Sequence, residues 1–271
     1  MNTDRLAEEV RSVVVPLDGW PDSERGLLPA QHLARRLGVP LLLLSTVEDE
    51  HEVNNRRIDL ETRAALLDEV DVRVEVAVDP HVLDTLLAHD RAGELVVMAT
   101  SGHTGLHDGY VGSMAEKVLR RSGHPTVLVG RHVELGMSFD IGRVVVALDG
   151  SKRAEVAAQV GAWWATRLGV QLWLVQVLSR RQSGDAEQQS RYLRHVALEL
   201  DTDADAQWDV LHGRDVADEL LDAAGTDGLL VVATHGRTGL SRMVLGSVAN
   251  EVTRRSTQPV VVVAAPDLEE D

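Results

Sequence analysis

The chain repeats one pattern of motifs in its two halves. The string ATSGHTGLHDGYVGS at residues 99–113 returns as ATHGRTGLSRMVLGS at residues 233–247, an offset of 134. Near the start of each half, RSVVVPLDG at residues 11–19 returns as GRVVVALDG at residues 142–150, an offset of 131. Because these matches keep the same order and differ only by a small insertion, they predict that one fold occurs twice in tandem.

The boundary between the halves is predicted within residues 131–142. This segment contains Gly136 and Gly142 and has no periodic apolar pattern, which is typical of a connection between folded units. The predicted domains are therefore residues 1–135 and 140–271. A length of 271 residues agrees with them, since chains of this size tend to form about two domains.

Each half alternates short valine-rich runs with longer segments of helical period. In the first half the runs are residues 13–17, 41–47, 72–78, 95–100 and 126–129. The segments long enough for crossover helices include residues 23–37, 54–70 and 80–89. We interpret the runs as apolar at successive positions, which indicates parallel strands buried on both faces. The predicted fold is α/β, with two tandem doubly wound parallel sheets that bind ligands at the carboxyl ends of their strands.

The composition excludes several classes of function. The formal net charge of −16 disfavours binding to nucleic acid and to anionic membranes. Cysteine is absent, which excludes disulfides, thiolate nucleophiles and cysteine metal sites. Residues 1–12 have no apolar segment of signal-peptide length, and no apolar run approaches the roughly 18 residues of a membrane span. We therefore expect a soluble, cytoplasmic protein.

A glycine–serine loop follows the fourth predicted strand of each half. Its landmarks are Gly102, Gly112 and Ser113 in the first half and Gly236, Gly246 and Ser247 in the second. Glycine allows positive φ and close approach of an anion, and the N–H groups at the start of a helix attract phosphate. The loops are predicted to bind phosphate, although one such loop alone could simply shape a turn.

Helix starts and strand ends add further candidates. Ser113 with Glu116 three residues later predicts a capping box, and Ser247 with Asn250 has half of that pattern. The first strands end in Pro-Leu-Asp18 and Ala-Leu-Asp149. Each carboxylate could accept hydrogen bonds from a base or a ribose, or could be a turn aspartate that binds nearby backbone N–H groups.

Known catalytic and metal motifs are missing from the sequence. It has no Gly-Lys-Ser/Thr end of a Walker A loop, no GxGxxG after a first strand, no HExxH and no Gly-x-Ser-x-Gly. His103 and His107 have i, i+4 spacing but lie in a predicted loop. We assign no catalytic residue and no metal site, and we expect His103 to face the phosphates.

With these residues in place, nearly the whole chain resembles the universal stress protein family in its tandem form. The family's ATP-binding pattern, Gly-x-x-Gly, nine residues, Gly-Ser/Thr, is matched twice, with Ala99 and Ala233 in place of the first glycine. The resemblance implies an adenine nucleotide alpha hydrolase-like fold. It also implies that residues 126–129 and 260–263 pair across an internal pseudo-dimer.

The resemblance also implies the ligand and the role of each site residue. The ligand is ATP, with or without Mg²⁺. Asp18 and Asp149 would contact adenine, and Thr46 and Val177 would lie beside it. The phosphates would be held by Gly102, Gly112 and Ser113, and by Gly236, Gly246 and Ser247. The loop sequences themselves, rather than the resemblance, add His103 and Arg237 as candidates. The implied role is regulation of unidentified protein partners in a stress response, with slow ATP hydrolysis at most. The whole chain could also pair as a homodimer.

The two sites are predicted to be unequal. The second loop has Arg237 and Arg242 where the first has His103 and Asp108, so residues 232–256 carry +3 and residues 98–122 carry +1. Gly213 also replaces Asp79 after the third strand. ATP should therefore bind the second half more tightly. The alternative function is a protein-interaction module whose loops no longer bind nucleotide.

Overall fold

The structure is a computed structural model that describes residues 10–91, 93–100, 111–122, 124–134, 140–179, 186–234 and 245–264. The first half contains β1 (Val13–Pro16), a 3-10 helix (Pro21–Gly26), α1 (Leu27–Leu37), β2 (Leu41–Val47), α2 (Glu50–Ala64), β3 (Val72–Val78), α3 (Val82–Arg91), β4 (Leu95–Ala99), α4 (Ser113–Arg121) and β5 (Thr126–Val129). The second half contains β6 (Arg143–Ala147), α5 (Lys152–Leu168), β7 (Gln171–Ser179), α6 (Ala186–Glu199), β8 (Ala206–Gly213), α7 (Val216–Ala224), β9 (Gly228–Ala233), α8 (Ser247–Arg255) and β10 (Val260–Val263).

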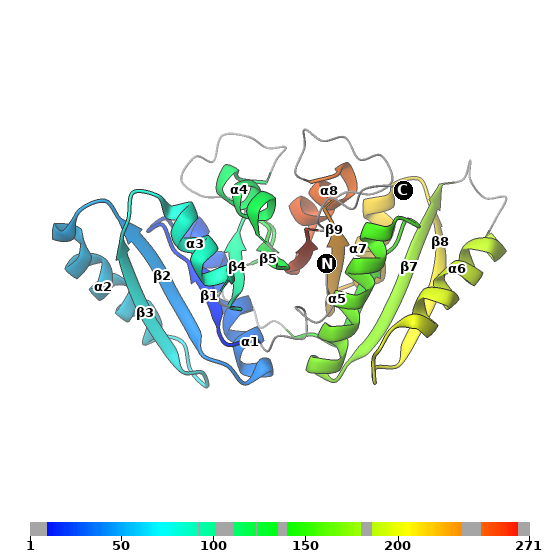
Figure 1. The fold of residues 1–271 in the computed structure, drawn as a ribbon, viewed down its shortest axis with the longest axis horizontal. Coiled ribbons are helices and arrows are strands. Elements are labelled where there is room, and N and C mark those ends of the chain that lie inside the picture. The colour runs from blue at the N-terminus through cyan, green and yellow to red at the C-terminus, as the bar shows by residue number, and fades with distance from the viewer. Residues whose placement is uncertain are drawn as a thin grey trace.

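All ten strands form one sheet in the order β3-β2-β1-β4-β5-β10-β9-β6-β7-β8 (Figure 1). The strands within each half are parallel, whereas β5 and β10 are antiparallel, with Val127 opposite Val261. The order reverses between β1 and β4 and again between β6 and β9, as in a doubly wound sheet. The predicted α/β fold and the predicted pairing of the two halves are confirmed.

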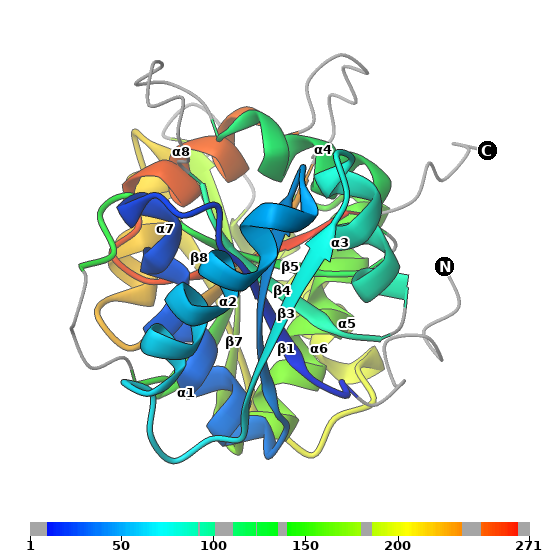
Figure 2. The same cartoon turned by 90° about the vertical axis from the view of Figure 1, so that its left-hand side faces the viewer.

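Helices cover both faces of each half-sheet (Figure 2). One apolar cluster joins the sheet to α1, α2, α5 and α6, and a second joins its other face to α3, α4, α7 and α8. Val13 and Val15 belong to the first cluster and Val14 to the second. Both faces of the central strands are therefore buried, as the continuous apolar runs predict.

The outermost strand β3 departs from that prediction. Its residues VRVEVAV alternate between partly buried and exposed positions, with Arg73 and Glu75 on the exposed face. Interpreting residues 72–78 as buried on both faces was wrong, because β3 is the edge of the sheet and only its α2 side is covered. Charged residues on an edge strand also discourage pairing with another sheet.

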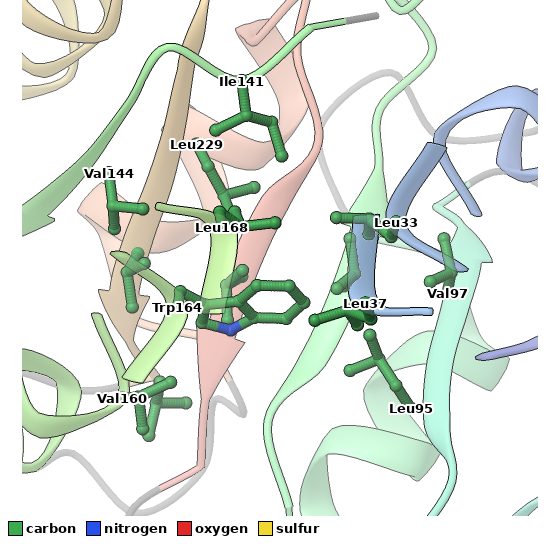
Figure 3. Close-up of a cluster of buried hydrophobic side chains, with 14 of the residues drawn as sticks. Leu33, Leu37, Leu95, Val97, Ile141, Val144, Val160, Trp164, Leu168 and Leu229 are labelled. Atoms are coloured by element: carbon green, nitrogen blue, oxygen red, sulfur yellow. The ribbon is translucent and has the colours of Figure 1, made fainter. Parts of the chain in front are cut away.

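The two halves meet through apolar side chains beneath the β5–β10 pair. Figure 3 shows Trp164 of α5 directed toward Leu37 of α1. Trp164 is 1% exposed, and Arg36 of α1 donates a hydrogen bond to the carbonyl of Leu168. The interface thus resembles a domain core rather than a loose contact.

Candidate functional site

The carboxyl ends of the first strand of each half form tight turns around an aspartate. Asp18 Oδ1 accepts a hydrogen bond from the N–H of Trp20 at 2.9 Å. Asp149 Oδ1 accepts from the N–H of Ser151 at 3.0 Å and from its hydroxyl at 2.7 Å. Both aspartates therefore have the turn role, which leaves Asp18 Oδ2 with no hydrogen bond among the described residues.

The second glycine of each loop closes the loop at its base. Gly112 N–H donates to Thr100 O at 2.7 Å, and Gly246 N–H donates to Thr234 O at 2.5 Å. A Cβ at Gly112 would lie 2.5 Å from Thr100 O, closer than real Cβ atoms approach. Gly112 has a φ of −57° and Gly246 of −61°. Glycine is therefore required at position 112 because the backbone of Thr100 lies too close for a Cβ, and not because φ is positive.

The serines that follow these glycines keep their hydroxyl groups available. Ser113 and Ser247 are the first residues of α4 and α8, and both are exposed. The predicted capping box was wrong, because Gly112 is the N-cap and no side chain caps α4. Neither serine hydroxyl forms a hydrogen bond within the described part of the chain. Each lies at a helix N-terminus, where free N–H groups and the helix dipole favour an anion.

A cavity of about 300 Å³ opens at this edge of the first half. Five of the predicted site residues line it: Asp18, Thr46, Ala99, Gly112 and Ser113. The volume is at the lower end of the range for small-molecule sites, roughly 300–1,000 Å³. The structure therefore brings these residues to one concave surface, with polar groups at its rim and apolar side chains within.

Sequence reasoning missed most of the cavity wall. Leu44, Leu86, Met98 and Met114 also line it, and all four contribute to the apolar cluster on the α3–α4 side of the sheet. Their positions at strand ends and on the inner faces of helices resemble ordinary core positions, so nothing in the sequence separates them from the core. Together they make the inner part of the cavity apolar.

The second half places the equivalent residues at the same points of the fold. Asp149 follows β6, Val177 lies in β7, Ala233 ends β9, and Gly246 and Ser247 begin α8. The strand ends also correspond, since Thr100 N–H donates to Val129 O and Thr234 N–H donates to Val263 O, each at 2.9 Å.

Four predicted site residues lie outside the described residues: Gly102, His103, Gly236 and Arg237. Among the described residues, no group of three or more His, Asp or Glu side chains is placed to hold one metal ion. None of the described helices combines the length and apolar character needed to cross a membrane.

A sequence profile of the universal stress protein family matches residues 9–130 and 141–264. The chain belongs to the universal stress protein family. Universal stress protein Rv2005c from Mycobacterium tuberculosis is 31% identical over 190 residues, a match covering 66% of this chain and 64% of that protein. The match thus spans less than two thirds of this curated relative.

Solved structures show the same tandem fold. A universal stress protein from Archaeoglobus fulgidus superposes with a TM-score of 0.66 at 20% identity, covering 94% of this chain and 97% of its own. A putative universal stress protein from Pseudomonas aeruginosa superposes with a TM-score of 0.66 at 18% identity, covering 96% of this chain and 95% of its own. At these identities the likeness concerns the fold alone.

The two halves of this universal stress protein differ at the turn after the third strand. Asp79 accepts hydrogen bonds from the hydroxyl of Thr85 at 2.6 Å and from the N–H of His81 at 2.7 Å, and these hold its pKa below the usual value. In the second half, the carboxylate of Glu219 occupies the space that a side chain at Gly213 would need. Gly213 therefore does not remove a carboxylate from this turn, and that part of the predicted charge difference was wrong.

Charged residues beside the strand-one turns were also missed. Arg56 of α2 reaches this turn in the first half, where its Nη2 lies 3.5 Å from the carbonyl oxygen of Asp18. In the second half, Lys152 and Arg153 begin the helix that follows Asp149. A cation from a distant helix thus reaches the first turn, whereas two cations follow the second turn directly in the sequence.

Proposed function

We propose that this universal stress protein binds ATP at the carboxyl edge of each half and that occupancy regulates its association with protein partners. The observation that carries the proposal is the exposed hydroxyl of Ser113 at the start of α4, on the rim of the 300 Å³ cavity. A hydroxyl and free helix N–H groups beside an apolar cavity suit a ligand with a flat apolar part and an anionic part.

The rest of the cavity fits an adenine nucleotide. Asp18 Oδ2 is available to accept a hydrogen bond from an exocyclic amine or a ribose hydroxyl. Leu44 and Met98 supply apolar surface for a base. Gly102, His103 and Gly112 would complete the phosphate site of the first half, and Gly236, Arg237 and Gly246 that of the second. ATP would bring Mg²⁺ as its counter-ion.

The proposal assigns a regulatory role in the cytoplasm. The described residues include no nucleophile paired with a general base at the cavity, so the residues support binding more than turnover. Binding at the junction of β1, β2 and α4 can alter the position of α4, which packs over the central strands of the sheet (Figure 1). A change there could alter the surface that a partner meets.

Native mass spectrometry and isothermal titration calorimetry test the proposal. We expect two Mg-ATP molecules per chain and a rise in melting temperature with ligand, since binding to the folded state alone stabilises it. The variant Ser113→Ala should weaken one of the two sites, because it removes the hydroxyl at the rim of the cavity. The control Thr257→Ala removes a hydroxyl from an exposed threonine after α8 and should leave both sites unchanged.

The alternative is a protein-interaction module that no longer binds nucleotide. A purified chain that carries no nucleotide and shows no thermal shift with millimolar Mg-ATP would support that alternative and contradict the proposed ATP binding. It would also remove the proposed role for the cavity.

A further inference from the structure

The first half exposes a group of cations that no other described residue neutralises. Arg91 ends α3, and Lys117, Arg120 and Arg121 lie on α4. All four are exposed, and none forms an ion pair or a hydrogen bond within the described part of the chain. We call these four residues the α3–α4 basic surface.

Helical spacing and one partly buried hydrogen bond bring the four residues together. Lys117, Arg120 and Arg121 have i, i+3 and i, i+4 spacing, which places them on one side of α4. Asp90 accepts a hydrogen bond from the hydroxyl of Ser122 at 2.7 Å, joining the end of α3 to the end of α4. Arg91 and Arg121 each adjoin one member of that contact, so the basic surface extends across both helix ends.

The second half provides an internal comparison, because two of the corresponding positions carry no cation there and the arginines at the other two form ion pairs. Glu251 stands where the first half has Lys117, and Gly225 where it has Arg91. Arg254 pairs with Glu251 at 2.7 Å, and Arg255 pairs with Asp215 and Asp218. The helix dipole explains why arginines occur in the last turn of both α4 and α8. It does not explain why those of α4 have no ion-pair partner among the described residues.

We propose that the α3–α4 basic surface binds an acidic segment of a partner protein. Unpaired cations cost little when solvated, and they become favourable contacts once a complementary charge arrives. The net charge of −16 repels extended polyanions such as duplex DNA and anionic membranes, whereas a short acidic peptide can approach the surface locally. This binding does not depend on nucleotide occupancy.

Fluorescence anisotropy with a labelled glutamate–glycine peptide tests this proposal on the full chain. The double variant Arg120→Glu/Arg121→Glu should weaken binding by about tenfold or more. The matched control Arg191→Glu/Arg194→Glu changes two exposed arginines of α6 by the same charge and should bind as the unmodified chain does. Lys117→Glu, which introduces the residue found in the second half, should weaken binding in the same direction.

Melting temperatures identify any variant that fails to fold, and Lys117→Glu tests the surface even if the double variant does. The proposal is overturned by an unmodified chain that does not bind the peptide at low salt, or by equal losses in the α4 and α6 variants. It is also overturned if duplex DNA, or vesicles of phosphatidylcholine with about 30% phosphatidylserine, bind more tightly than the peptide.

Discussion

At Gly112 one backbone contact joins the two ends of the glycine–serine loop of the first half. The N–H of Gly112 donates to the carbonyl of Thr100, and no side chain fits between them. The contact fixes where α4 begins and therefore where its free N–H groups point. A change at this residue should act on the site without touching a ligand.

We expect Gly112→Ala to destabilise the fold by about 1–3 kcal/mol, because the added methyl group must displace Thr100. ATP binding to the first half should also fall, so that calorimetry detects one strong site instead of two. Gly38→Ala is the matched control, since Gly38 has a φ of 70° and nothing near its Cβ position. It should cost roughly 1–2 kcal/mol and leave both sites intact. Two unchanged sites in the Gly112 variant would contradict the role given to the loop closure.

His32 makes stability depend on pH. Burial lowers its pKa from 6.5 to about 4, with Arg35 and Arg36 adding to the effect and Asp140 opposing it. Between these values the unfolded chain binds a proton that the folded chain does not, so the free energy of unfolding should decrease as pH falls from 6.5 to 4.

His32 contributes at most about 3 kcal/mol to this pH dependence of the free energy of unfolding. Urea denaturation at pH 7 and pH 4.5 should show a smaller pH effect in His32→Gln than in the unmodified chain. His195→Gln, on the exposed side of α6, serves as the control. An equal pH effect in the unmodified chain and His32→Gln would contradict this account.

At the scale of elements, α4 and α8 hold their last-turn arginines at a distance from the glycine–serine loops. A net charge summed over the whole loop–helix segment therefore does not describe the charge near the loop. Arg120, Arg121, Arg254 and Arg255 lie in the last turns of α4 and α8, away from the loops. Without these distant turns, residues 98–116 carry −2 and residues 232–250 carry +2. The difference between the two halves is therefore larger near the loops than the whole segments indicate.

Calorimetry should consequently give a tighter ATP site in the second half, with a difference that narrows as salt screens the exposed charges. Gly236→Val should remove the tighter site, and Gly102→Val the weaker one. Equal dissociation constants, or tighter binding in Gly236→Val than in Gly102→Val, would contradict the predicted asymmetry.

Local sequence signals predicted some elements closely and failed where distant contacts decide. Residues 41–47, 72–78 and 126–129 match β2, β3 and β5. The helix expected at residues 54–70 instead occupies Glu50–Ala64, because Asp49 accepts a hydrogen bond from His51 N–H and caps its start. The Glu219 carboxylate beside Gly213 was not predictable from aligned positions. Glu219 lies on α7, whereas Asp79, the acidic residue of the first half, lies in the turn itself. The cavity wall likewise depends on packing between elements.

At the scale of the whole molecule, the two halves share one apolar core beneath the central strands. We expect Trp164→Ala to cost about 3–5 kcal/mol, because it empties a buried site facing Leu37 of the other half (Figure 3). Urea unfolding followed by circular dichroism should show a large loss and a less cooperative transition. Trp208→Ala on edge strand β8, where the side chain is 37% exposed, should cost much less. Equal costs would contradict the interface described above.

The antiparallel pairing of β5 with β10 joins strands of a single polypeptide. Dilution does not separate them, and the covalent connection favours pairing within one molecule over pairing with a copy from another. The effective concentration of one half around the other is set by the segment that connects them, and not by how much protein the cell makes. The proposed site of the first half is therefore covalently linked to that of the second half, so any difference between the two is inherited together in every molecule.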